Sequence, residues 1–120
     1  MEFYLSTRKV GEVIVVDMSG RLIEGEPASL LRDTVRRFVA DGNRKFILDL
    51  GGVSFINSCG LNALTAIRCW MDERGGKVSL LHLTRRVREV LEITQLVKVF
   101  DRFDDEEEAI RSFNAVGVPE

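Results

Sequence analysis

The feature that most constrains the fold is the run KFILDL at residues 45–50. It is apolar almost throughout, and only Asp49 interrupts it. A strand with one face in water alternates apolar and polar residues, whereas a nearly continuous apolar run is typical of a strand that is covered on both faces. The sequence therefore predicts a parallel or mixed sheet with other elements packed on its two sides.

Strands and helices alternate around this run. Residues 2–6 and 12–18 are rich in β-forming side chains, and Gly11 between them suits a turn, so they predict a leading antiparallel hairpin. Periodic apolar residues predict helices in four segments, 28–43 (with Pro27 in its first turn and Gly42 as its stop), 58–73, 84–94 and 104–113, and further strands over 77–82 and 97–100. Because parallel neighbours need a long crossover, we expect one α/β domain with a mixed sheet and helical crossovers.

Length and charge narrow the class of protein. The 120 residues suit one domain, which we expect over residues 1–114 with a flexible tail at 115–120. The 17 basic and 19 acidic residues give a net charge of −2, which argues against nucleic-acid binding. The sequence has neither a targeting signal nor an apolar run of membrane-spanning length, so we expect a cytoplasmic protein without membrane insertion. Cys59 and Cys69 fit neither a zinc nor a redox motif, and we expect no metal and no cofactor.

A polar stretch, Asn57, Ser58, Cys59 and Gly60, lies where the apolar strand gives way to a helix. In α/β sheets this junction is the usual position of functional groups. Asn57 is a good N-cap, which leaves Ser58 near the first helical position, where free N–H groups and the helix dipole favour an added phosphate. Ordinary helix capping is the commoner explanation of an Asn-Ser pair at a helix start, and the residues alone leave both interpretations open.

The sequence around this stretch resembles a known family. Residues 48–64 (LDLGGVSFINSCGLNAL) are similar to the central V-x-F-x-D-S-[small]-G-L-x-x-L motif of STAS domains, the small domains of sulfate transporters and anti-sigma-factor antagonists. The segment 20–35 (GRLIEGEPASLLRDTV) is similar to the family's glycine-led entry to its first helix, and 87–110 to its closing helix, strand and acidic segment. The resemblance covers nearly the whole chain and implies a STAS-like fold.

Resemblance to the stand-alone members implies a regulatory switch. Their partner is an anti-sigma factor that is also a serine kinase. The unphosphorylated antagonist binds this kinase and frees the sigma factor, and the phosphorylated serine corresponds to Ser58 here. Asn57 departs from the family, which usually has Asp at this position. The alternative is a constitutive, unphosphorylated STAS adaptor in a transport or multi-protein complex.

We expect the partner surface to centre on Ser58, Leu61 and Asn62, next to the loop that contains Gly20 and Glu24, and to include Asn57. For Leu61 the alternative is a place in the core, because it also fits the apolar face of the helix. Two further residues are expected to support the site. Asp49 would accept hydrogen bonds from the following 51–57 loop, and Gly60 is the glycine of the motif.

Catalysis is poorly supported. A nucleophile elbow needs G-x-S-x-G, but Ile56 occupies the place of the first glycine, and His82 is the sole histidine available as a base. No glycine-rich phosphate loop is present. We therefore expect no enzyme. Redox sensing by Cys59 is a minor alternative, and the basic face of Arg85, Arg86 and Arg88 would either be solvated or meet an acidic partner.

Overall fold

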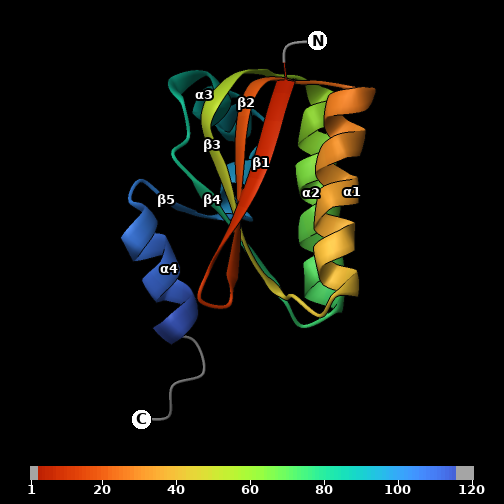
Figure 1. Ribbon diagram of the computed structural model, residues 1–120. Helices are drawn as coiled ribbons and strands as arrows, with labels where there is room; N and C mark the ends of the chain where they lie inside the picture. Colours follow the sequence, from red (N-terminus) through yellow and green to blue (C-terminus); the bar gives the residue numbers. More distant parts are fainter. Residues whose placement is uncertain (1–2, 116–120) are drawn as a thin grey trace.

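The computed structural model describes residues 3–115, which form a five-stranded sheet flanked by helices (Figure 1). The strands lie in the order β1-β2-β3-β4-β5. The elements are β1 (Phe3–Val10), β2 (Val13–Leu22), α1 (Glu26–Ala40), β3 (Lys45–Ile56), α2 (Ser58–Glu73), β4 (Lys77–Leu81), α3 (Arg85–Ile93), the short 3₁₀ helix η1 (Leu96–Lys98), β5 (Asp101–Phe103) and α4 (Glu106–Ala115).

The sheet is mixed, as the sequence predicts. β1 and β2 pair antiparallel through a turn at Gly11 and Glu12, and Gly11 adopts a φ of 61° that favours glycine. The pairs β2–β3, β3–β4 and β4–β5 are parallel. The α/β class, the leading hairpin and the helical crossovers are therefore confirmed.

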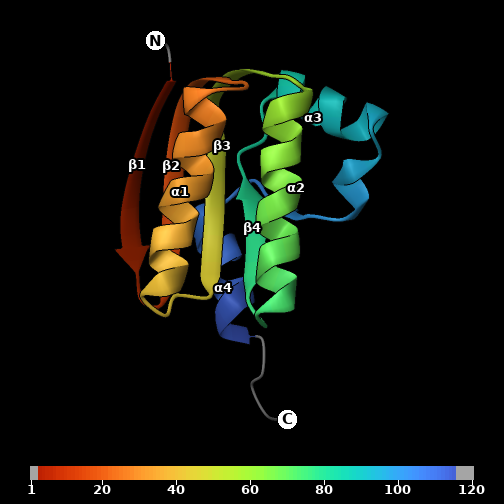
Figure 2. The same cartoon turned by 90° about the vertical axis from the view of Figure 1, so that its right-hand side faces the viewer.

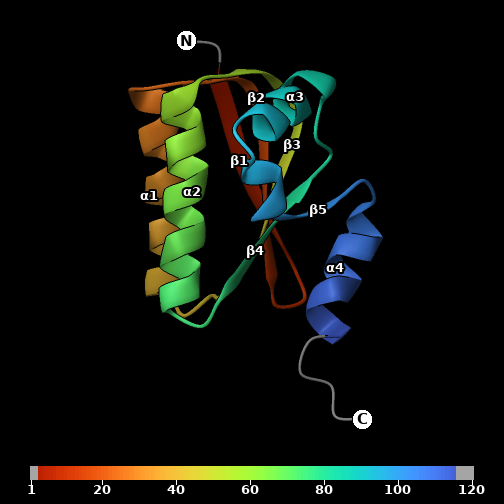
Figure 3. The same cartoon turned by 180° about the vertical axis from the view of Figure 1, so that it is seen from behind.

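Helices cover both faces of the sheet, which explains the continuous apolar run in β3. α1 and α2 lie on one face and α4 on the other (Figures 1 and 3). Phe46, Leu48 and Leu50 point into the larger core beneath α1 and α2. Ile47 points into a second cluster that Phe113 of α4 helps to form. Both sides of the strand are therefore removed from water.

The strand predicted at residues 97–100 is wrong. Gln95 adopts a left-handed φ of 63°, Leu96–Lys98 forms η1, and Phe100 is buried in the larger core. The edge strand β5 comes directly afterwards, as the three residues Asp101–Phe103. Apolar side chains here fill a turn that leads back to the sheet, and this turn has the same composition as a strand.

The last helix also begins later than predicted. Asp105 precedes α4 and its carboxylate accepts a hydrogen bond from the N–H of Glu108 at 2.9 Å, which satisfies a free donor of the first turn. α4 continues to Ala115, one residue into the predicted tail. The rest of that tail, residues 116–120, lies outside the described residues.

An ion-pair cluster attaches α4 to the sheet. The guanidinium of Arg8 in β1 donates to both oxygens of Asp17, at 2.7 and 3.1 Å, and to both oxygens of Glu106, at 2.8 and 2.7 Å. These hydrogen bonds lower the pKa of the Asp17 and Glu106 carboxyl groups. The cluster thus joins three elements that are far apart in the sequence.

We expect Arg8→Met to lower the free energy of unfolding at pH 7 by about 1–2 kcal/mol, since two carboxylates lose a shared, partly exposed partner. A carboxyl whose pKa is lowered by folding stabilises the protein above its unfolded pKa, and this contribution is lost as pH falls through the folded pKa. In urea unfolding, the free energy of unfolding of the wild type should therefore fall below about pH 4, and this fall should be smaller in Arg8→Met. Lys9→Met, at the neighbouring exposed position, is the control. Identical pH profiles for the wild type and Arg8→Met would contradict this role.

Candidate functional site

The candidate site lies where β2 and β3 end and α1 and α2 begin. Figure 2 shows the first turns of both helices next to each other at this end of the sheet. The sequence predicted a loop after Leu50, and this prediction is wrong. The segment belongs to β3, which pairs with β2 as far as Ile56. Gly52 permits this close pairing, because a Cβ at this position would lie 2.7 Å from the Cβ of Ser19. The site is therefore built on paired strands.

Asn57 caps the N-terminus of α2. Its side-chain oxygen accepts a hydrogen bond from the N–H of Gly60 at 3.1 Å, and its carbonyl accepts one from the N–H of Leu61 at 2.9 Å. Ser58 is the first residue of the helix and is exposed. Its side chain therefore lies in solvent beside the positive end of the helix dipole, where an added negative charge is favourable.

Glu24 and Asn57, both expected in the partner surface, contact each other. The side-chain amide of Asn57 donates to the Glu24 carboxylate, and this hydrogen bond is the main cause of the lowered pKa of Glu24. Glu24 lies in the short segment 23–25 between β2 and α1. The pair joins the two strand-to-helix connections across the end of the sheet.

The remaining residues of the expected surface divide into two groups. Asn62 is exposed on α2, one turn after Ser58. Leu61 is only 6% exposed and belongs to the larger core, so the expected apolar contact at this position is corrected to a core residue. Gly20 lies within β2 with a φ of 99° and pairs with Val53, so its place is in the strand and not in a loop.

Asp49 lies on the opposite face of the sheet from α2. Its Oδ1 accepts a hydrogen bond from the N–H of Gly51 at 2.9 Å and lies 3.2 Å from Nδ1 of His82. Its contact with the segment after it is thus limited to Gly51. His82, the base that a hydrolase at Ser58 would need, contacts Asp49 on this other face, so the described residues assemble no Ser-His pair at the start of α2.

Sequence reasoning missed a cationic cluster next to the site. The guanidinium carbons of Arg21 and Arg86 lie 5.3 and 5.2 Å from the centre of the Phe55 ring. Arg21 pairs with Phe55 in the register of β2 and β3, and α3 brings Arg86 to the same ring. Thr84 fixes this position, because its hydroxyl caps α3 and also donates to the carbonyl of Val53. The basic face of α3 was noted in the sequence, but its aromatic partner depends on the register of β3.

The family model of the STAS domain matches residues 4–109 of the chain. The chain belongs to the STAS family. BtrV of Bordetella bronchiseptica, named as a candidate anti-sigma factor antagonist, is 27% identical over 109 residues, which cover 91% of this chain and 93% of that protein. The expected family is thereby confirmed.

Solved structures agree with this membership. The crystal structure of a candidate anti-sigma factor antagonist from Thermotoga maritima has a TM-score of 0.84 and 26% identity, and the match covers 90% of this chain and 92% of that one. Unphosphorylated SpoIIAA, an anti-sigma factor antagonist, shares the fold with a TM-score of 0.76 at 20% identity, over 94% of this chain and 100% of its own. Within residues 3–115, no helix of this STAS domain has the length and apolar character needed to span a membrane.

The Glu24–Asn57 contact changes the expected effect of restoring the usual family residue. Asn57→Asp keeps an oxygen for the N–H of Gly60 but replaces the amide donor with a second carboxylate facing Glu24. We expect the pKa of Glu24 to rise. We also expect a urea midpoint slightly below that of the wild type at pH 7, and this difference should disappear as Glu24 is protonated at low pH. Carboxyl NMR titration measures the first effect. Glu24→Gln in the Asn57→Asp background should restore the midpoint, and an unchanged Glu24 pKa would contradict the interaction.

Proposed function

We propose that this protein is an anti-sigma-factor antagonist. In its unphosphorylated form it binds an anti-sigma factor that is also a serine kinase, and so releases the sigma factor. Phosphorylation of Ser58 ends the binding. The observation that supports this proposal best is the exposed Ser58 at the first position of α2, capped by Asn57, in a chain that matches the STAS family over most of its length.

The local physical chemistry supports a switch at this position. A phosphate on Ser58 would add a charge of about −1.5 to −2 beside the free N–H groups of the first turn. The domain tolerates this charge, whereas a partner packed on Ser58 would have to desolvate it. Such a switch works by local exclusion of the partner and needs no rearrangement of the sheet. SpoIIAA, whose fold this chain shares, has been solved in both unphosphorylated and phosphorylated forms.

The partner surface that we propose consists of Glu24, Asn57, Ser58 and Asn62, with Arg21 and Arg86 at its border. The first four present carboxylate, amide and hydroxyl groups from two neighbouring connections. The two arginines offer positive charge to an acidic part of the partner, and such charges chiefly raise the association rate.

The test is incubation with ATP and the proposed partner, an anti-sigma factor with serine kinase activity. Mass spectrometry should detect one added phosphate, located on Ser58, and none on the Ser58→Ala variant. Phosphate on another residue would contradict the proposed switch.

A second candidate is a constitutive STAS adaptor without phosphorylation. It is favoured by Asn57, whose amide is engaged with Glu24 where the family usually carries Asp. A protein of the sulfate transporter family from Wolinella succinogenes also shares the fold, with a TM-score of 0.68 at 17% identity over 86% of this chain and 85% of its own. If only the Asn57→Asp variant accepts phosphate, the adaptor is the better description.

A further inference from the structure

The free edge of β1 is a second candidate surface. β1 is the first strand of the sheet and has eight residues that pair with β2 without a register shift. Long, regular edge strands are templates for pairing with another chain unless charges, prolines or bulges block them. In β1 only Arg8 and Lys9 are charged, and Arg8 is held by Asp17 and Glu106. The part of the edge from Phe3 to Thr7 therefore carries no such protection.

The hairpin determines which backbone groups point outward. The turn between Val10 and Val13 has two residues, so this closing pair exchanges both of its hydrogen bonds. Because antiparallel pairs alternate, Leu5, Thr7 and Lys9 direct their N–H and C=O groups away from β2. These three residues offer an evenly spaced set of donors and acceptors to an added strand.

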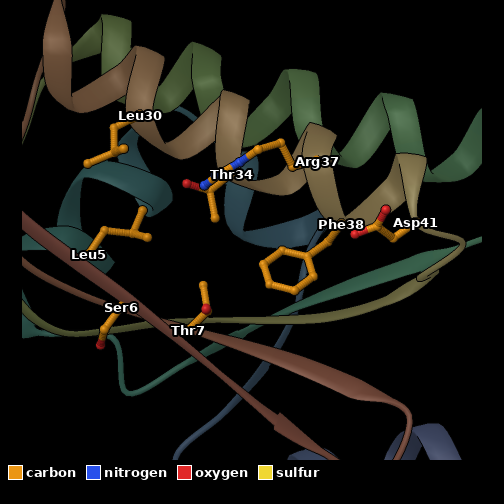
Figure 4. Close-up of a pocket in the computed structure, with 8 residues that line it drawn as sticks. All are labelled: Leu5, Ser6, Thr7, Leu30, Thr34, Arg37, Phe38 and Asp41. Carbon is orange, nitrogen blue, oxygen red and sulfur yellow. The ribbon is translucent and has the colours of Figure 1, made fainter.

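A groove of about 460 Å³ runs along this edge, between β1 and α1 (Figure 4). Leu5 and Thr7 line it from the strand, and Leu30 and Phe38 line it from the helix. Leu30 is 37% exposed, which is high for a large apolar side chain. The groove thus combines an open backbone edge with apolar walls.

Polar groups line the same groove. Thr34 is 1% exposed, and its hydroxyl has no hydrogen-bond partner among residues 3–115. A buried hydroxyl without a partner costs free energy, so its position calls for an explanation. Arg37 lies one turn further along α1 and Asp41 lies beyond it, and both line the groove (Figure 4). Positive and negative charge therefore follow one another from Thr34 toward the C-terminal end of α1.

We propose that this edge and groove bind an extended segment of a partner protein, which adds as an antiparallel strand to β1. Side chains at i and i+2 of a strand are about 6.8 Å apart, and Leu30 and Thr34 are separated by about 6 Å along the helix axis. If the added strand has an apolar side chain near Leu30, the residue two positions away in that strand lies at Thr34 and Arg37. The residue four positions away lies near Asp41. The Arg37 guanidinium favours an acidic residue at the former position. Asp41 favours a basic residue at the latter, which also faces Lys9 of β1 across the strand pair.

α1 and β1 run in the same direction (Figure 2), so an antiparallel segment has the sequence pattern basic-x-acidic-x-apolar. Its backbone bonds to Leu5, Thr7 and Lys9, its apolar side chain contacts Leu5 and Leu30, and its carboxylate accepts from the Thr34 hydroxyl and Arg37. This surface is separate from Ser58, so binding here is independent of the proposed switch.

The test uses two synthetic peptides of identical composition. The probe is Ac-Thr-Lys-Thr-Glu-Thr-Leu-Thr-NH₂, and the control, Ac-Thr-Glu-Thr-Lys-Thr-Leu-Thr-NH₂, exchanges the two charges. In NMR titrations of the ¹⁵N-labelled protein, the probe should cause saturable shifts in β1 and α1 and slow the exchange of the Leu5 and Thr7 amides about tenfold. The control peptide should bind at least about fivefold more weakly. Equal binding of both peptides, or shifts at Ser58 and Asn62 instead, would overturn the proposal.

Variants test the two kinds of contact separately. Thr7→Pro removes an outward N–H without removing a bond to β2 and should abolish binding. An N-methyl group on the Glu of the probe tests backbone pairing in the unchanged protein, and it should also abolish binding. Arg37→Gln should weaken binding about tenfold. The control is Arg36→Gln, because the Arg36 guanidinium stacks on Trp70 outside the groove, and this variant should change binding less than twofold.

Two further experiments test whether binding at this edge is independent of Ser58 and whether the occupant is a second copy of this chain. Ser58→Asp should bind the probe with unchanged affinity, whatever its effect on an anti-sigma factor, and a change there would contradict a separate surface. If the protein alone forms a dimer in sedimentation experiments and the Leu5 and Thr7 amides are already protected, the occupant is a second copy and the proposed partner segment is wrong.

Discussion

Ser58→Asp is expected to weaken binding to the anti-sigma partner about a hundredfold or more, without a change of fold. A carboxylate at the first helical position is stabilised by the dipole by about 0.3–1 kcal/mol, so the domain has no cause to rearrange. In the complex, the same charge is desolvated without a partner, which costs about 3 kcal/mol or more. Each 1.4 kcal/mol corresponds to a tenfold change in affinity. Calorimetric titration of the two proteins measures this loss.

A control variant separates the effect of where the charge lies from the effect of the changed net charge. Ala66 is exposed on α2, two turns after Ser58, so Ala66→Asp adds the same charge to the same helix away from the proposed surface. It should bind within about threefold of the wild type. Amide NMR shifts in Ser58→Asp should remain near residues 57–62 and 24. Shifts spread over the sheet, or an affinity like that of Ala66→Asp, would contradict local exclusion.

Gly60→Ala is expected to cause the largest loss of stability among single substitutions at the site, about 2–4 kcal/mol. A Cβ at this position would collide with the backbone oxygen of Leu22 and lie 2.8 Å from Cγ1 of Ile56. The Leu22 oxygen cannot yield easily, because Leu22 pairs with Ile56 at the end of β2 and β3. The first turn of α2 would therefore have to move away from the sheet, and with it Asn57 and Ser58.

Cys59→Ala is the matched control for this prediction. Cys59 is the neighbouring residue in the same turn and is exposed, so its replacement should change the free energy of unfolding by less than about 0.5 kcal/mol. Urea unfolding of the two variants gives the comparison. Equal stability of Gly60→Ala and Cys59→Ala would show that the helix and strand do not approach as closely as the structure indicates.

The central part of the fold could be predicted because its pattern has one physical solution. A run such as KFILDL cannot face water on either side, and the following Asn-Ser stretch satisfies a helix start. The strand at 97–100 could not be predicted correctly, because Val97, Val99 and Phe100 are apolar in either case. Where the turn ends and the strand that pairs with β4 begins depends on the distance back to the sheet edge.

The candidate site shows the same division. Asn57 as the N-cap and Ser58 at the start of the helix were identifiable from the sequence, since capping depends on chemistry within four residues. The burial of Leu61 was not decidable, because a leucine one turn into a helix fits a core face as well as a rim. The Phe55 cluster and the Glu24–Asn57 contact depend on a β3 that continues past two glycines, which composition alone describes as a loop.

The sequence by itself determined the α/β class, the hairpin, the start of α2 and the family, because these follow from local periodicity, turn chemistry and a contiguous motif. Only the tertiary structure decided which side chains share a surface. Strand register brings Arg21 to Phe55, α3 adds Arg86, and α1 packed beside the unpaired edge of β1 forms the groove. The reason is physical: local preferences act over a few residues, whereas register and packing are set by the burial of the whole core, which joins positions far apart in the chain.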